Sequence, residues 1–114
     1  RPATTSRAVI SRVIRGEIGF NGLLISDDLS MKALGGGLAG RASGALHAGC
    51  DVVLHCNGDL AEMQVVAAGA RELSGRAAER AAAALARRPA MVEPLDHRGA
   101  TERFDALMAG RVAA

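Results

Sequence analysis

The sequence is nearly free of aromatic side chains: it has no Trp and no Tyr, and Phe20 and Phe104 are its only two Phe residues. We therefore expect a core built from Ala, Leu, Val, Ile and Met. Nucleic-acid surfaces usually show stacking aromatics or a clustered basic stripe. The 14 basic residues, of which Lys32 is the single lysine, are instead dispersed among 12 acidic ones and leave a net charge of +2. Nucleic acid is therefore not an expected partner.

Cysteine is also scarce, with only Cys50 and Cys56 present. If both lie on one strand they are about 20 Å apart, at roughly 3.3 Å per residue. A disulfide needs Cα atoms within about 7 Å, so the two cannot pair within the chain. Free thiols favour a reducing compartment, and we expect a cytoplasmic location. No apolar run approaches the roughly 20 residues of a membrane span, so no membrane partner is expected.

The hydrophobic pattern predicts helix, strand, helix and strand, followed by further helices. Such an order contains a strand–helix–strand crossover, which indicates an α/β fold with a parallel sheet. The predicted elements are a helix after Ser6 with Val9, Ile10, Val13 and Ile14 on one face, a strand at 23–25, a helix at 39–48 ended by Gly49, a strand at 51–56, and helices at 59–70, 76–88 and 101–109.

The strand at 23–25 is apolar on both faces, as in a parallel sheet covered by helices, and it leads into Ser26, Asp27 and Asp28. Ligands of α/β folds bind at the carboxyl ends of such strands. Two adjacent carboxylates are costly as structural filler, because like charges repel and lose hydration. The pair is therefore a candidate catalytic site.

Two strands do not make a stable parallel sheet alone, since sheets usually carry about four to six. A closed eight-stranded barrel takes about 250 residues. We therefore expect residues 1–114 to be part of a larger domain, which needs either the remainder of that domain or self-association.

Two blocks resemble the bacterial β-N-acetylhexosaminidases of glycoside hydrolase family three, enzymes of cell-wall recycling. The blocks are Gly19-Phe20-Asn21-Gly22 with Ser26-Asp27-Asp28-Leu29-Ser30-Met31, and Ala48-Gly49-Cys50-Asp51-Val52-Val53-Leu54. The resemblance implies a (β/α)8 TIM barrel, of which this chain would be the C-terminal portion, with the last two strands and the closing helices. It also implies hydrolysis of terminal non-reducing β-N-acetylglucosamine from muropeptides or related oligosaccharides, with no metal or organic cofactor.

The resemblance makes Asp27 the nucleophile of a retaining mechanism, which requires the carboxylate to be ionised. Its neighbours are candidates for a polar shell that holds it so: Ser26, Asp28 and Ser30. Two positions remain open between substrate contact and a local role. Met31 would pack in its loop or line the sugar pocket, and Asn57 would contact the sugar or belong to an Asn-Gly turn.

The family's acid/base is a histidine on a glycine-rich loop that precedes this region. His47, His55 and His97 do not lie in that context, so the chain carries half of a catalytic pair. The alternative is a catalytically silent barrel fragment or interaction module. A phospho-receiver domain is disfavoured, because its fold needs an aspartate and a lysine at the ends of later strands, whereas the second strand here ends in His55, Cys56 and Asn57.

Overall fold

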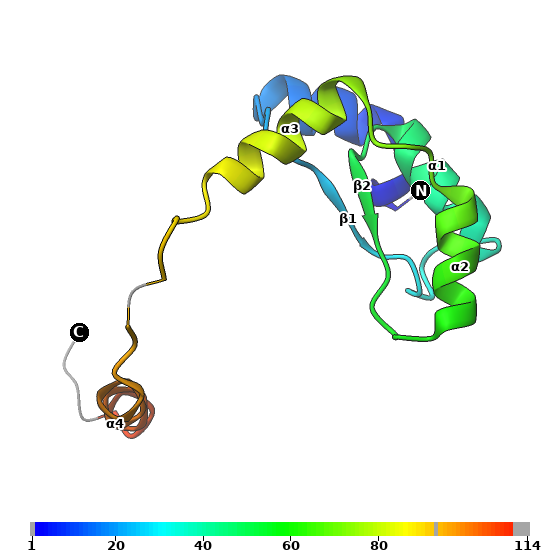
Figure 1. Cartoon of the computed structure of the whole chain (residues 1–114). Coiled ribbons are helices and arrows are strands. Elements are labelled where there is room, and N and C mark those ends of the chain that lie inside the picture. Colours follow the sequence, from blue (N-terminus) through cyan, green and yellow to red (C-terminus); the bar gives the residue numbers. More distant parts are fainter. Residues whose placement is uncertain (1, 93, 111–114) are drawn as a thin grey trace.

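The computed structural model describes residues 2–92 and 94–110. A short sheet and the helices beside it form the main body, and helix α4 lies apart from it (Figure 1). In chain order the elements are the 3-10 helix η1 (Ala3–Thr5), the π-helix η2 (Val9–Glu17), β1 (Ile25–Asp28), α1 (Leu38–Ala48), β2 (Val52–Leu54), α2 (Leu60–Gly69), α3 (Gly75–Ala86) and α4 (His97–Met108).

Strands β1 and β2 pair in parallel, with α1 as the connection between them. Ile25 lies opposite Val52 and Asp28 lies opposite Leu54, with an irregularity in the register between these two pairs. Helix α1 packs against β2 and against α2. The predicted strand–helix–strand crossover and the mixture of helix and strand are therefore confirmed.

The bounds of both strands differ from the prediction. The first strand is Ile25–Asp28 rather than 23–25, so it contains both aspartates instead of preceding them. The second is Val52–Leu54 rather than 51–56, so His55 follows it. The apolar run marks where side chains are hydrophobic, whereas the strand is defined by backbone hydrogen bonds, which the hydrophobic pattern does not report.

The two strands are not covered on both faces by the described residues. Ile25 is 51 % exposed and Leu54 on β2 is 42 % exposed. The described sheet has two strands, so each has a neighbour on one side only. Apolar side chains of a parallel sheet are normally covered, and these two lack such cover among residues 2–92 and 94–110.

The core is small and aliphatic, as the lack of aromatics predicts. Leu29, directly after β1, is completely buried, whereas Phe20 and Phe104 are both exposed. The buried cluster consists of Ile10, Leu29, Leu34, Ala42, Ala45, Ala48, Cys50 and Val66.

The first helical segment buries part of its predicted apolar face. Ile10 is buried and Ile14 packs against the core, but Val13 is 38 % exposed. The segment is a π-helix rather than a regular α-helix. Just beyond its end, the Phe20 N–H donates to the Ile14 carbonyl at 2.9 Å. Gly49 ends α1 as predicted, with φ of 121°, a value that side chains rarely permit.

The later helices include two with side-chain caps, and one of them begins earlier than predicted. Asp59 caps α2 by accepting a hydrogen bond from the Glu62 N–H at 2.9 Å. Ser74 precedes α3 without a side-chain cap. Helix α4 begins at His97 rather than at 101, because Asp96 accepts from the Gly99 N–H at 3.1 Å and caps it there. None of the described helices has the length and hydropathy needed to cross a bilayer.

Candidate active site

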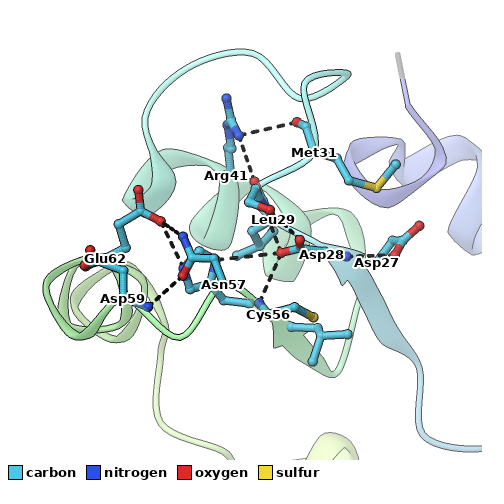
Figure 2. Close-up of polar contacts among 12 residues, drawn as sticks. Asp27, Asp28, Leu29, Met31, Arg41, Cys56, Asn57, Asp59 and Glu62 are labelled. Atoms are coloured by element: carbon cyan, nitrogen blue, oxygen red, sulfur yellow. Dashed lines mark hydrogen bonds and ion pairs between the residues drawn. The ribbon is translucent and has the colours of Figure 1, made fainter.

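Asp27 and Asp28 are neighbours on β1 whose side chains point in different directions (Figure 2). Successive side chains of a strand project to opposite faces, so the two carboxylates have different surroundings. Asp27 is exposed, while Asp28 is partly buried and its carboxylate lies at the centre of the contacts drawn in Figure 2. The pair that the sequence presents as one acidic motif is therefore divided into two separate sites.

Asp28 joins the end of the first strand to the end of the second. Its Oδ1 accepts from the Ser30 N–H at 3.0 Å and from the Cys56 N–H at 3.3 Å, and its Oδ2 accepts from the Ser30 hydroxyl. These donors, the Ser30 hydroxyl first, lower the pKa of Asp28 below its ordinary value of 3.8. Asp28 therefore has a structural role, as an ionised group that organises two loops.

Asp27 has fewer contacts than the predicted polar shell implies. Its Oδ1 accepts from the Asp28 N–H at 2.8 Å. The Ser26 hydroxyl donates to the Asp27 backbone carbonyl at 2.8 Å rather than to the carboxylate, and it accepts from the Leu54 N–H at 3.0 Å. The Ser30 hydroxyl bonds Asp28. The predicted shell of three side chains is therefore not formed around the Asp27 carboxylate.

The loop after β1 is held by Arg41, a residue of α1. Its guanidinium donates to the Leu29 carbonyl at 2.8 Å, to the Gly36 carbonyl at 2.9 Å and to the Met31 carbonyl at 3.4 Å. Figure 2 shows this arginine reaching toward the backbone at Leu29 and Met31. The Met31 side chain is 44 % exposed, so it does not pack in the loop interior and remains available to a ligand.

Asn57 makes local contacts after β2. Its Oδ1 accepts from the Asp59 N–H at 3.0 Å, as in an Asx turn, and its Nδ2 donates to Glu62. The turn interpretation of Asn57 is thus supported, and its contact with a sugar stays a prediction.

His55 and Glu62 also belong to the polar residues around Asp28, and the sequence pattern does not single them out as site residues. The His55 side chain is 5 % exposed; Nδ1 lies 3.7 Å from Asp28 Oδ1, and Nε2 lies 3.2 Å from Glu62 Oε2. The available signals were a histidine within an apolar strand pattern and a capping box at the start of α2. Neither signal shows that the two side chains meet.

A second polar cluster lies at the opposite end of the strands, around Asp51. Its Oδ2 accepts from the Arg15 guanidinium at 2.7 Å and from the Leu24 N–H at 2.8 Å, and its Oδ1 accepts from Arg80 at 2.9 Å. Asp51 thereby connects η2, the start of the sheet and α3. The second strand begins at Val52, so Asp51 lies directly before β2 rather than in it, and Arg80 anchors α3 to its carboxylate.

Two cavities of about 790 and 830 Å³ lie at that opposite end and share Phe20, Asn21 and Arg80 in their linings. Asp27 lines neither of them. No group of three or more His, Cys, Asp or Glu residues suited to a metal ion occurs in the described ranges 2–92 and 94–110.

The family of the chain follows from its match to a family model. Residues 1–88 match the model described as the N terminal domain of glycosyl hydrolase family 3. The match covers more than half of the 114 residues, and the chain therefore belongs to glycosyl hydrolase family 3. The expected C-terminal location is corrected at the level of domains, since residues 1–88 match the family's N-terminal domain.

Curated relatives narrow the class to proteins named beta-hexosaminidase. The one from Tolumonas auensis is 51% identical over 59 residues, which are 50% of this chain and 18% of the relative. That from Xanthomonas oryzae pv. oryzae is 43% identical over 75 residues, 64% of this chain and 22% of the relative. That from Nitrosospira multiformis is 51% identical over 65 residues, 54% of this chain and 19% of the relative. The chain thus matches about a fifth of the length of these relatives.

Proposed function

We propose that this chain supplies the nucleophile-bearing part of a β-N-acetylhexosaminidase. The enzyme would remove terminal non-reducing N-acetylglucosamine from peptidoglycan fragments. The observation that carries the proposal is the division of the aspartate pair: Asp28 is occupied by backbone and hydroxyl donors, whereas Asp27 is exposed at the carboxyl end of a parallel strand. Carboxyl ends of strands are where barrel enzymes place catalytic groups.

The chemistry assigned to Asp27 is a double displacement with retention of configuration. One carboxylate oxygen attacks the anomeric carbon, and the bond from that carbon to the leaving oxygen breaks. A proton from an acid outside this chain's motifs neutralises the leaving group. Water, which gives a proton to the conjugate base of that acid, then attacks the same carbon. The bond between this carbon and the Asp27 oxygen breaks, which releases N-acetylglucosamine and restores both the carboxylate and the acid. The Asp28 N–H donates to Asp27 Oδ1 at 2.8 Å and so orients the carboxylate that begins the cycle.

In this proposal β1 and β2 are the last two strands of a (β/α)8 barrel. Their parallel pairing through α1 and the exposure of Ile25 and Leu54 support it, because a barrel covers both faces of each strand. The barrel's other strands would complete the sugar pocket around Asp27 and supply the acid/base. The free thiols of Cys50 and Cys56 support a cytoplasmic location.

The test is hydrolysis of a chromogenic N-acetylglucosaminide by the full-length product of the gene. We expect Asp27→Asn to lower kcat by several orders of magnitude while the far-ultraviolet circular dichroism spectrum is kept. Asp105→Asn, an exposed carboxylate on α4, is the matched control and retains the wild-type rate.

Covalent trapping identifies the residue directly. An activated 2-fluoro or 5-fluoro sugar that accumulates the glycosyl–enzyme intermediate, followed by peptide mass mapping, should label Asp27. A label on Asp28 would move the role by one residue. Equal rates for wild type and Asp27→Asn would favour a catalytically silent barrel module.

A further inference from the structure

His55 is a buried histidine without a role in the chemistry assigned to Asp27. Its side chain is 5 % exposed, and neither ring nitrogen makes a hydrogen bond to any other described residue. A buried polar atom without a partner destabilises a fold, so histidine at this position is costly compared with an apolar ring. The surroundings of the ring suggest what offsets that cost.

Each ring nitrogen faces a carboxylate from a different element. Asp28 Oδ1, at the end of β1, lies 3.7 Å from Nδ1, and Glu62 Oε2, in the first turn of α2, lies 3.2 Å from Nε2. These are the carboxylates within 4 Å of the ring among the described residues. The Asn57 amide donates to the same Glu62 oxygen that faces the ring, so that oxygen is held in place. The ring therefore lies between two oriented acceptors.

We propose that His55 is a positioning residue of the hydrolytic reaction: it bridges Asp28 and Glu62 and so sets the direction of the Asp27 carboxylate. The inference rests on the proposed function, because it takes Asp27 as the nucleophile. The path from the ring to Asp27 is short. Asp28 is the next residue in β1, and its N–H donates to Asp27 Oδ1 at 2.8 Å.

The bridge adds a direct link between the strand ends and α2, beside the local contacts of Asn57 with Glu62 and with the Asp59 N–H. The Asp28 carboxylate already accepts from backbone amides after β1 and after β2. His55 extends this connection to α2, which otherwise packs mainly on α1. Movement of α2 relative to the sheet would then displace Asp28 and, with it, the donor on which Asp27 rests. A misplacement of about 1 Å at a reacting group lowers the rate by roughly a hundredfold.

The experiment compares variants that keep the volume of the ring with variants that keep its polarity. His55→Phe fills the same space without nitrogen atoms, and His55→Gln retains a donor. We expect His55→Phe to lower kcat by about ten- to a hundredfold with KM within about twofold, and we expect His55→Gln to recover part of the loss. The rate of trapping by the fluoro sugar should fall in parallel, because positioning affects the step in which Asp27 attacks.

Glu62→Gln tests the other end of the bridge. The Glu62 side chain is 44 % exposed, so removal of its charge perturbs folding less than a change at the buried ring. It should lower kcat in the same direction as His55→Phe. The control is His47→Phe: His47 is exposed on α1 and contacts Ser43 of the same helix, so its replacement should leave kcat unchanged.

The outcomes separate the inference from the proposed function. Wild-type kcat in both His55→Phe and Glu62→Gln, with Asp27→Asn inactive, overturns the positioning role and leaves the nucleophile intact. Full activity of Asp27→Asn overturns the proposed function itself. If His55→Phe does not fold, the test rests on His55→Gln and Glu62→Gln. A lowered kcat at an unchanged Tm in these two variants supports the bridge, and a wild-type kcat in both refutes it.

Discussion

Replacement of Asp51 by Asn should destabilise the fold more than any other single loss of charge in the described residues. The Asp51 side chain is 6 % exposed and contacts the guanidinium groups of Arg15 and Arg80 at 2.7 and 2.9 Å. It also accepts from the Leu24 N–H at 2.8 Å. An asparagine keeps the shape but removes the charge, and its amide hydrogens face at least one arginine as donor against donor.

The magnitude follows from burial. Removal of one partner of a buried ion pair costs about 3–5 kcal/mol, because the other charge is left uncompensated. The side chains of Arg15 and Arg80 are 16 % and 17 % exposed, so water reaches them to some extent. We therefore expect a loss of about 3 kcal/mol in the free energy of unfolding, at the lower end of that range. Small domains have about 5–15 kcal/mol in total, so this is a large fraction.

Urea unfolding followed by far-ultraviolet circular dichroism measures the loss, with Asp105→Asn as the exposed control. A double-mutant cycle of Asp51→Asn with Arg80→Met should show a coupling free energy of about 1–3 kcal/mol. A loss below about 1 kcal/mol in Asp51→Asn would refute the reasoning, because it would mean that the contacts behave like solvated surface pairs.

Three further changes have defined outcomes. Gly49→Ala should lower the free energy of unfolding by about 1–3 kcal/mol in urea, because φ is 121° and the new Cβ would lie 2.9 Å from the Ile10 side chain; an unchanged midpoint would contradict this. The folded state lowers the pKa of Asp28, so its stabilisation is present above the ordinary value of 3.8 and is lost as the pH falls below it. The fall in Tm between pH 6 and pH 3 should therefore be smaller in Asp28→Asn than in wild type. Arg41→Met removes three hydrogen bonds to the loop worth about 1 kcal/mol each, so amide exchange at residues 29–36 should accelerate roughly a hundredfold, and equal exchange would show that the loop is held by other contacts.

The features that the sequence predicts well are those decided within a few residues. Gly49 ends α1 because a left-handed residue is needed there, and Asp59 caps α2 because its carboxylate reaches the N–H three residues on. The crossover between the strands follows from the order of apolar segments alone. Such local rules depend on backbone geometry and spacing, and both can be read from the printed chain.

Features that depend on contacts between residues far apart in the sequence are harder to predict from the sequence. The position of β1 depends on backbone pairing with the segment after α1: the Leu24 carbonyl accepts from the Asp51 N–H at 2.9 Å, across α1 and the loop before it. The meeting of His55 with Glu62 depends on how α2 returns along the sheet after its turn. A hydrophobic pattern reports which residues avoid water, but it does not report which polar groups meet when the helices pack.

The aspartate pair shows how the two kinds of information combine. In the sequence Asp27 and Asp28 are two equivalent acids, and only the family resemblance assigns them different roles. Once both lie in a strand, the alternation of side chains sends one toward the donors of the second strand and leaves the other exposed. A single carboxylate cannot both hold two loops together through several hydrogen bonds and remain free to attack a carbon atom. In the proposed mechanism the pair would meet both demands, because Asp28 takes the first and leaves Asp27 for the second. Asp28 is therefore expected to matter to the reaction without touching the sugar.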